Sequence, residues 1–419
     1  MSKENVSKTV IKMLCLGCGV CQDVCPKHCI SIVHNRTNYP AVDENTCVEC
    51  GKCLKSCAGL GIEILSRSRK LFSEECCKEN TYLGRYLNCY KGYSNDYEIR
   101  YHSASGGCLS QFLIWLLEKK IIDGAVVTRF KKDAPMTPEP FVAKTKDEIL
   151  SGKSSKYCVV SMEGILTEIK QKEGRYVVVG LPCHIHAIRK CMDIDKQLRE
   201  RVVGCFAIYC SSNKTMDSQK YLQYRYGVDK KQLRSFAYRD NGCLGSMYFR
   251  DRDGNNIVNP IYYLDYYLGM RAFFSVPRCS QCNDFFGELA DVSFGDLNRG
   301  REDDDPIGIN SLVARSCYWD ELLHQCQKEG ALTLEPLDEE SMIQAQGYCK
   351  ATKKGEGFYA QRNWNKFWNK AVPEYDNLLK IEPPKSAYLK IMATSVMRFV
   401  GKHPSLWFVI KKLDKNNKN

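Results

Sequence analysis

The sequence predicts a small cysteine-rich α+β module at the N-terminus, followed by a larger α/β domain with a β-rich insertion. Three observations support this prediction. One cysteine pattern occurs twice within the first seventy residues. Strand-like and helix-like segments alternate from Tyr86 onward, which is typical of a sheet covered by helices. A tyrosine-rich stretch between Ser235 and Val276 interrupts that alternation around an Asp-Gly turn. We expect three regions, 1–70, 85–345 and a helical, basic tail at 346–419.

The N-terminal repeat has the form Cys-x₂-Cys-x₂-Cys-x₃-Cys. Its two copies consist of Cys15, Cys18, Cys21 and Cys25, and of Cys47, Cys50, Cys53 and Cys57. Bacterial ferredoxins hold [4Fe–4S] clusters with this run, and its fourth cysteine normally ligates the other cluster. The module is therefore predicted to be ferredoxin-like. We assign one cluster to Cys15, Cys18, Cys21 and Cys57, and a second to Cys25, Cys47, Cys50 and Cys53.

Zinc sites and disulfides are the alternatives for these cysteines. Structural zinc sites usually space their ligands as two pairs, whereas each copy here is a triplet with a fourth member. Soft thiolates in this arrangement suit iron–sulfur clusters. An additional cysteine, Cys29, is interpreted as a small buried apolar residue.

The composition indicates a protein of a reducing compartment. Twenty-four cysteines among 419 residues would be unusual in a cytosolic protein unless metal used them. Thiolates oxidise readily where they are exposed, so we expect an oxygen-poor cell. The sequence contains no apolar run as long as a membrane span and no signal-peptide core at Met1–Asn5. We therefore expect a cytoplasmic protein.

The formal charge of +12 raises the possibility of a nucleic-acid partner. Bound clusters would lower this charge, because each oxidised cluster with its four thiolates carries roughly −2. Outside the C-terminal tail, lysine and arginine are scattered along the chain. A zinc-dependent nucleic-acid-binding protein is thus the alternative from another functional class, and the cysteine triplets disfavour it.

The first unit of the larger domain is a helix with a glycine-rich start. Leu109, Phe112, Leu113, Leu116 and Leu117 recur with helical spacing, which predicts an amphipathic helix from about Leu109 to Lys120. Ser105 is a suitable N-cap residue, and glycine at 106–107 would leave the first-turn N–H groups accessible to an anion. A buried strand is expected at 124–128.

Two later strands end at cysteines. The apolar runs 176–180 and 202–209 are typical of parallel strands covered on both faces, and Cys183 and Cys210 follow their carboxyl ends. Ligands of open α/β sheets collect at such ends. A separate Cys-x₂-Cys pair, Cys279 and Cys282, is weak evidence for metal by itself and would need two more ligands.

Together these pieces resemble the coenzyme F-420 hydrogenase/dehydrogenase β-subunit family, whose members are flavin and iron–sulfur proteins. The matching stretches, in order, are Ser103-Ala-Ser-Gly-Gly107, Ser154-Ser-Lys-Tyr157, Gly180-Leu-Pro-Cys183, Ile208-Tyr-Cys210, Arg278-Cys-Ser-Gln-Cys282 and Ala290-Asp-Val-Ser-Phe-Gly-Asp296. They cover roughly residues 85–330. The resemblance is closer to bacterial members of unassigned substrate than to the hydrogenase subunits.

The resemblance implies FAD as a cofactor and a third [4Fe–4S] cluster beside it. The implied flavin contacts are Ser103, Ser105, Gly106, Gly107, Ser155, Lys156 and Tyr157. The implied ligands of the third cluster are Cys183, Cys210, Cys279 and Cys282. A lysine can neutralise a phosphate and a tyrosine can stack on a ring, although residues 154–157 alone would also fit a solvated loop. His102 and His184 lie beside matched motifs, but no proton donor is assigned.

These parts predict an FAD- and iron–sulfur-dependent oxidoreductase. It would pass electrons from a ferredoxin-like one-electron donor through the clusters to FAD, and on to a deazaflavin or small organic acceptor. The alternative is an electron-transfer subunit that relays electrons within a larger redox complex and has no substrate of its own.

The tail from Lys385 to Asn419 is basic and apolar, with one acidic residue, Asp414. Apolar residues that could share one helical face are Leu389, Met392, Val396, Phe399 and Val400. The pattern resembles an interfacial membrane anchor, which makes peripheral membrane contact one possibility. An ordinary packed C-terminal helix is the alternative that we favour.

Overall fold

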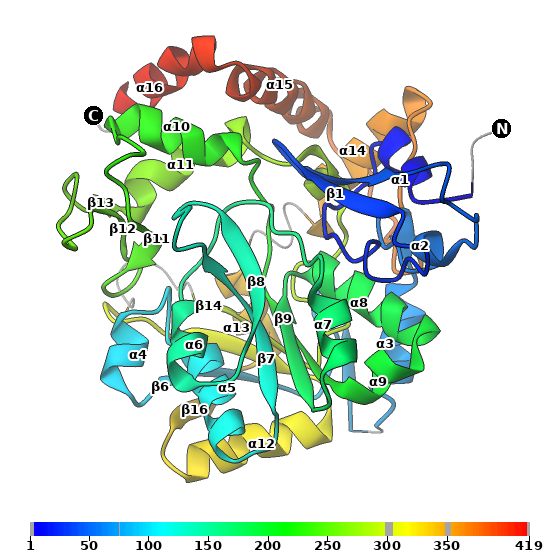
Figure 1. Ribbon diagram of the computed structural model, residues 1–419, viewed down its shortest axis with the longest axis vertical. Coiled ribbons are helices and arrows are strands. Elements are labelled where there is room, and N and C mark those ends of the chain that lie inside the picture. The colour runs from blue at the N-terminus through cyan, green and yellow to red at the C-terminus, as the bar shows by residue number, and fades with distance from the viewer. Residues whose placement is uncertain (1–3, 75, 298–304, 348–352, 417–419) are drawn as a thin grey trace.

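The computed structural model describes residues 4–74, 76–297, 305–347 and 353–416, and an eight-stranded mixed sheet forms its centre (Figure 1). The strand order is β16-β6-β15-β14-β10-β9-β7-β8. The bounds are β6 (Asn88–Ser94), β7 (Gly124–Phe130), β8 (Pro138–Ala143), β9 (Tyr176–Gly180), β10 (Val202–Ile208), β14 (Val292–Asp296), β15 (Asn310–Ala314) and β16 (Leu332–Pro336). Strands β7, β9, β10 and β14 are parallel, and the outer strands pair antiparallel. This confirms the predicted α/β class for the larger domain.

The central strands are apolar throughout because helices cover both faces of the sheet. Alternate residues of one strand point to opposite faces, so Val178 joins one core while Val177 and Val179 join the other. The helices of the first core are α7 (Ile165–Gln171), α8 (Pro182–Ile194) and α9 (Lys196–Arg201). The helices of the second are α5 (Cys108–Glu118) and α12 (Cys317–Lys328), with α4 (Tyr97–Tyr101) and α6 (Lys146–Ser151) beside them.

The predicted β-rich insertion is confirmed as a separate three-stranded antiparallel sheet. Its strands are β11 (Ser235–Asp240), β12 (Ser246–Arg250) and β13 (Ile261–Tyr262). Helices α10 (Asp217–Tyr226) and α11 (Tyr263–Phe273) share a third core with it. Several tyrosines of this segment, such as Tyr238 and Tyr266, are fully buried there.

The N-terminal segment packs directly against the larger domain. Its elements are α1 (Ser7–Ile11), β1 (Ile30–His34), β2 (Asn38–Val42), α2 (Lys52–Lys55), β3 (Gly61–Ile62) and α3 (Ile64–Leu71), followed by the hairpin of β4 (Lys78–Asn80) and β5 (Gly84–Tyr86). Val20 and Ile64 belong to the same buried core as Leu166 of α7 and Ile188 of α8. The Asp23 carboxylate accepts hydrogen bonds from backbone N–H groups at the start of α7. The division at residue 70 stays a prediction, since one core crosses it.

The chain returns to the N-terminal segment near its C-terminus. Strand β17 (Glu374–Tyr375) pairs in parallel with β3. A side chain at Gly61 would lie 2.0 Å from the Glu374 carbonyl oxygen, so only glycine allows this approach. The Asp376 carboxylate accepts hydrogen bonds from the N–H groups of Leu65 and Ser66, each at 2.8 Å.

The C-terminal region is mostly helical, and its division at residue 346 stays a prediction. Its helices follow α13 (Glu339–Ala345) and are α14 (Glu356–Phe367), α15 (Lys385–Lys402) and α16 (Trp407–Asn416), with a short 3₁₀ turn, η3 (Pro404–Leu406), between the last two. Another 3₁₀ turn, η1 (Pro277–Gln281), lies earlier in the chain. Helices α15 and α16 form an arc along one edge of the molecule (Figure 1). Across the part of the chain that the structure describes, every helix is too short or too polar to cross a membrane.

Candidate functional site

One hollow of the N-terminal segment gathers cysteines from both copies of the repeat. It is lined by Cys15, Cys18, Cys21 and Cys57, among apolar residues. The hollow holds about 360 Å³ of empty space, open solvent included. Burial raises the pKa of Cys15 to about 11 and that of Cys18 to about 12, and the neighbouring Cys57 thiol raises both. These thiols therefore stay neutral near pH 7 unless a bound cation stabilises the thiolates.

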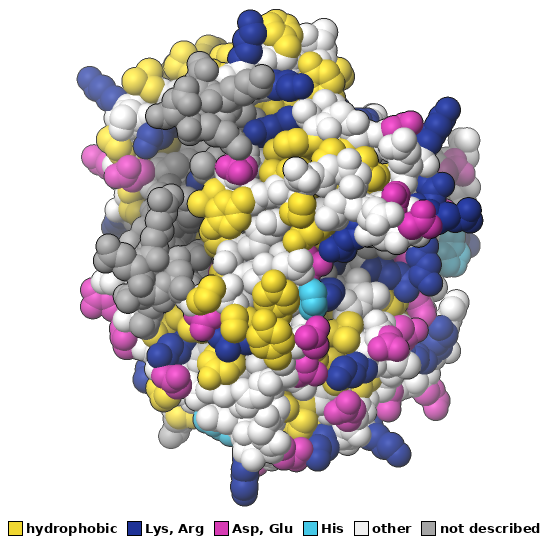
Figure 2. Space-filling model, turned by 90° about the vertical axis from the view of Figure 1, so that its left-hand side faces the viewer, with side chains coloured by type: hydrophobic (Ala, Val, Ile, Leu, Met, Phe, Trp, Pro, Cys, Tyr) yellow, Lys and Arg dark blue, Asp and Glu magenta, His cyan; other side chains and the backbone are white. Residues whose placement is uncertain are grey.

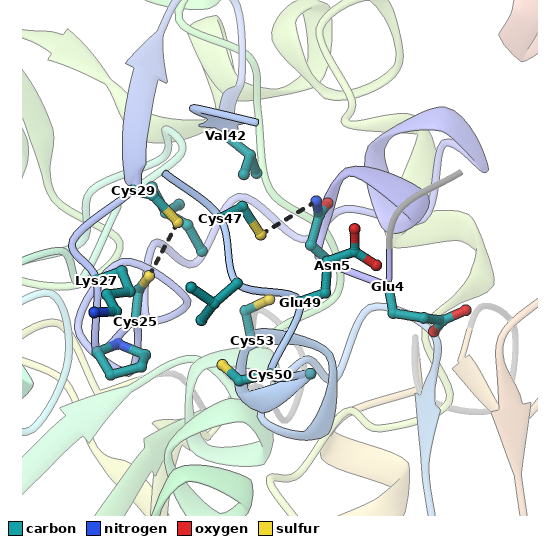
Figure 3. A pocket seen from close by; sticks show the side chains of 14 residues that line it. Glu4, Asn5, Cys25, Lys27, Cys29, Val42, Cys47, Glu49, Cys50 and Cys53 are labelled. Carbon is teal, nitrogen blue, oxygen red and sulfur yellow. Dashed lines mark hydrogen bonds between the residues drawn. The ribbon is translucent and has the colours of Figure 1, made fainter. Parts of the chain in front are cut away.

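A second hollow contains the other four cysteines of the repeat (Figure 3). Cys25, Cys47, Cys50 and Cys53 line it, and Cys50 is exposed to solvent. Cys29 is buried as expected, but its sulfur lies 3.3 Å from the Cys25 sulfur in the same hollow, a position the spacing did not indicate. The Asn5 amide contacts the Cys47 sulfur at 3.8 Å.

The four cysteines of the larger domain come from three separate elements. Cys183 lies in the first turn of α8, Cys210 follows β10, and Cys279 and Cys282 lie in and just after η1. Burial raises the pKa of Cys183, and the neighbouring thiols of Cys210, Cys282 and Cys279 raise it further. Buried Lys353 donates from Nζ to the Cys279 carbonyl oxygen at 3.2 Å. Burial alone would lower the pKa of Lys353, but the four thiols raise it.

The spacing of these cysteine side chains bears on whether they would hold a single metal ion or an iron–sulfur cluster. Among the described residues, no three His, Cys, Asp or Glu side chains converge on one point that would hold a single metal ion. A [4Fe–4S] cluster is larger, because inorganic sulfide and four irons lie between its thiolates. Thiols spread around a hollow fit a cluster better than one zinc ion. Iron–sulfur binding stays a prediction, as does the assignment of each ligand.

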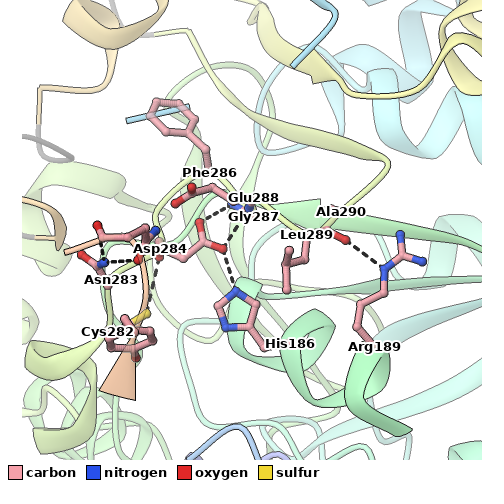
Figure 4. A network of polar contacts seen from close by, with 12 residues as sticks. His186, Arg189, Cys282, Asn283, Asp284, Phe286, Gly287, Glu288, Leu289 and Ala290 are labelled. Atoms are coloured by element: carbon pink, nitrogen blue, oxygen red, sulfur yellow. Dashed lines mark hydrogen bonds and ion pairs between the residues drawn. The ribbon is translucent and has the colours of Figure 1, made fainter. Parts of the chain in front are cut away.

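The segment after Cys282 is fixed against α8 (Figure 4). The buried Asp284 carboxylate lies 2.8 Å from His186 Nε2 and accepts the N–H groups of Gly287 and Glu288 at 2.7 and 2.9 Å. Burial would raise the pKa of Asp284, but the His186 bond holds it below its usual value. On the same helix, burial lowers the pKa of His184 to about 4, so His184 stays neutral. The bond between His186 and Asp284 thus ties the helix that contains Cys183 to the segment that contains Cys282.

Arg278 joins the first N-terminal hollow to the cysteines of the larger domain. Its side chain is 3% exposed. Nε donates to the Leu14 carbonyl at 3.1 Å, and Nη2 donates to the Gly59 carbonyl at 3.0 Å. Nη1 donates to the Gln281 carbonyl, between Cys279 and Cys282, at 2.9 Å. One guanidinium group therefore contacts the backbone beside both thiol groups.

The helix start at residues 103–108 differs from the prediction. Ser105 is not the N-cap of α5, because its hydroxyl donates to the Ile309 carbonyl at 2.6 Å. Gly107 takes that position with φ of 76°, and the Asn310 side chain accepts the Cys108 N–H at 2.9 Å. Ser103 donates to the Ile99 carbonyl in the same way, at 2.6 Å.

Gly106 serves close packing in this structure. A Cβ atom at Gly106 would lie 2.7 Å from both the Asn310 nitrogen and the Gly92 carbonyl oxygen. The glycine therefore lets the loop pack closely against the paired residues Gly92 of β6 and Asn310 of β15. The predicted flavin contacts at Ser103, Ser105, Gly106 and Gly107 stay predictions.

The loop that contains Ser155, Lys156 and Tyr157 packs between the large sheet and the insertion. Lys156 Nζ donates to the carbonyls of Gly152 and Lys153, both at 2.6 Å, and burial lowers the pKa of Lys156 to about 7. The Tyr157 ring lies in an aromatic group, 5.2, 5.9 and 4.8 Å from the rings of Tyr238, Tyr263 and Tyr267. Tyr157 thus packs in an aromatic group and Lys156 is engaged with its own loop, and the flavin contacts at Ser155, Lys156 and Tyr157 stay predictions.

Two cations beside this aromatic group were not singled out from the sequence. Arg239 is 2% exposed and pairs with Asp296 at 2.7 Å, while its Nη2 has no partner among the described residues. Lys214 is fully buried, lies 5.5 Å from the Tyr267 ring centre, and has its pKa lowered by burial to about 8. Asp296 ends the last matched motif, and a partly buried carboxylate favours a cation partner. A search of the sequence for that partner could have pointed to Arg239.

The fold and these groups define a class of protein: a mixed-sheet α/β protein that gathers buried thiols, tyrosines and cations beyond the carboxyl ends of its parallel strands. Two family profiles match the chain, the N-terminal part and the C terminus of the coenzyme F420 hydrogenase/dehydrogenase β subunit, at residues 89–167 and 173–340. Together they cover more than half of the chain. The chain belongs to the coenzyme F420 hydrogenase/dehydrogenase β-subunit family, which confirms the resemblance. The matched region starts after the cysteine repeat, so the ferredoxin-type module stays a prediction.

Relatives of this chain include proteins from methanogens. The coenzyme F420 hydrogenase β subunit of Methanosarcina barkeri is 25% identical over 266 residues, which are 62% of this chain and 86% of that protein. The coenzyme F420-dependent sulfite reductase of Methanocaldococcus jannaschii is 21% identical over 342 residues, 75% of this chain and 51% of that protein. The chain thus spans about half the length of that reductase.

A solved structure shares the fold. One chain of the xenon-derivatised F420-reducing [NiFe] hydrogenase complex of M. barkeri matches with a TM-score of 0.55 and 20% sequence identity. The match covers 70% of this chain and 98% of that chain.

Proposed function

We propose that this chain is an iron–sulfur flavoprotein oxidoreductase that passes electrons between a ferredoxin-like one-electron carrier and a deazaflavin or small organic acceptor. The observation that carries the proposal is the grouping of the twelve predicted ligand cysteines into three sets, with Cys29 as an additional thiol in one of them. Two relatives carry coenzyme F420 in their names, so a deazaflavin is the first acceptor to test.

Each group of residues has a role in this proposal. When bound, clusters would supply single-electron transfer and a flavin would supply two-electron or hydride transfer. The cysteine sets would hold the clusters, and Lys353 and Arg278 place positive charge beside them to offset the thiolates. Tyr157 and its aromatic neighbours would cover a planar ring, and the unpartnered Nη2 of Arg239 offers a donor to an anionic group.

The test is metal and flavin analysis of protein purified without oxygen. We expect about twelve irons and one flavin per chain if three cubane clusters and FAD are bound. About four irons, or no flavin, would contradict the proposal.

Removal of one ligand gives a sharper result. Cys279→Ser should lose about four irons and leave the N-terminal pair of clusters. Cys326→Ala is the control, since Cys326 is a buried cysteine of α12 that lies outside all three groups, and its removal is at least as demanding on the fold as that of the partly buried Cys279. Equal iron loss in both variants would mean that the substitution acts through folding rather than ligation.

A second candidate function is a relay subunit without its own substrate. The exposure of Cys50, together with 56% exposure of Val48 at the edge of the second hollow, favours contact with a redox protein there. Co-purification of a stoichiometric partner would support the relay. Turnover of a small acceptor by the isolated chain would support the enzyme.

A further inference from the structure

Helix α15 presents an apolar stripe to solvent. The exposed fractions are 66% for Leu389, 51% for Met392, 65% for Val396 and 58% for Phe399. Spacings of three, four and three residues place these side chains on one side of the helix. The other side packs against the protein through Ala387, Ile391 and Gly401, which are buried. The helix is therefore packed on one side and exposes this stripe on the other, whereas a surface helix normally buries its apolar stripe. The choice between a packed helix and a membrane anchor stays a prediction.

Two further exposed aromatic residues lie at the end of a neighbouring helix. Trp364 of α14 packs against Ala387 and Ile391, so the last turn of α14 lies beside the packed side of α15. Phe367 and Trp368 at that turn are 76% and 55% exposed. Aromatic side chains such as these are enriched at membrane–water interfaces, where the ring is partly buried and partly hydrated.

The charge around the stripe is positive. Between Lys385 and Asn419 the sequence has eight lysine and arginine residues and a single acid, Asp414. Lys390 and Lys402 are exposed on α15 itself. Figure 2 shows Lys and Arg side chains next to apolar ones along the top edge, where Figure 1 places α15 and α16. A cationic fringe around an apolar stripe complements anionic lipid headgroups above acyl chains.

We propose that α15 lies, through its exposed stripe, in the interface of an anionic membrane and holds this protein there as a peripheral protein. The helix would lie in the plane of the membrane with its stripe among the acyl chains and its lysines at the headgroups. This inference is independent of the oxidoreductase function, so either one can fail alone.

The test is co-sedimentation of the full-length protein with vesicles of phosphatidylcholine, alone or mixed with phosphatidylglycerol. We expect binding to the anionic vesicles, weakened by added salt because salt screens the lysines. The double substitution Val396→Glu with Phe399→Glu should lower the partition coefficient about tenfold or more, since two apolar contacts are replaced by charges that anionic lipid repels.

Tyr318→Glu is the matched control. Tyr318 is a 57% exposed aromatic residue on α12, at the opposite end of the molecule from α15 (Figure 1), and its replacement should leave binding unchanged. An unaltered circular dichroism spectrum checks the fold of each variant. Equal binding to neutral vesicles, no binding to either kind, or unchanged binding of the double variant would overturn the proposal. The proposal would also be overturned if the wild-type protein were a dimer that binds no vesicles and the double substitution made it a monomer. The stripe would then be a self-association surface.

Discussion

Replacement of Arg278 by Met tests whether the N-terminal segment and the larger domain are held as one unit. The guanidinium group donates to the carbonyls of Leu14 and Gly59, and both residues are buried. No other donor to these two oxygens is found among the described residues. The Gln281 carbonyl would keep one partner, because the Tyr375 hydroxyl also donates to it at 3.2 Å.

The magnitude follows from these two orphaned oxygens. Leaving a buried acceptor unpaired costs about 1–3 kcal/mol, so the free energy of unfolding should fall by about 2–6 kcal/mol. That loss is a large part of the total stability of an ordinary domain, about 5–15 kcal/mol. Urea unfolding followed by tryptophan fluorescence, without oxygen, measures the change.

Two further variants make the result specific. Arg278→Lys restores one donor and should recover part of the loss. Arg69→Met removes an exposed arginine that pairs with Glu79 at the surface, and its unfolding midpoint should stay close to that of the wild type. If Arg278→Met unfolds at the same urea concentration as Arg69→Met, the guanidinium group does not join the two parts.

Two more predictions concern surface sites. Hydrogen bonds from the Gly308 and Ile307 N–H groups and the nearby Arg100 lower the pKa of the Asp305 carboxylate, although partial burial opposes this shift. The carboxylate therefore stabilises the fold fully above its unfolded pKa of about 4, and this stabilisation is lost as the pH falls below that value. Asp305→Asn should therefore destabilise the protein by about 1 kcal/mol at pH 7 and by much less near pH 3, measured by urea unfolding at both values. The exposed sulfurs of Cys76 and Cys317 lie 3.6 Å apart, so mild oxidation with diamide should join them, as peptide mass spectrometry would detect. Burial raises the pKa of Cys77 to about 11, so a product linked through Cys77 instead would contradict this assignment.

The elements with local or repeated signals were predictable from the sequence. The apolar run 176–180 is β9, and the helical pattern after residue 108 is α5. The cysteine spacing also predicted that Cys57 would lie with the first triplet and Cys25 with the second, and the two hollows contain these residues. Spacing is informative here because the fourth cysteine of this run normally belongs with the triplet of the other copy.

Contacts between distant parts of the chain were not predictable in this way. Ser105 has the right chemistry for a helix cap, but the N–H group of Cys108 in the first turn of α5 donates to Asn310, 202 residues further along the chain. Lys156 has the charge for a phosphate, and its amine binds carbonyls of its own loop. The helical face of α15 was predicted, but whether that face is covered depends on which other elements reach it.

The pairing of β17 with β3 has a consequence for the order in which the protein is made. Residues 1–70 emerge from the ribosome long before Glu374 and Asp376, so the newborn N-terminal segment lacks the strand that pairs with Gly61 and the carboxylate that binds the first turn of α3. Residues 374–376 must therefore be translated before the scaffold around the repeat is complete. A chain that ends upstream of residue 374 would lack both contacts.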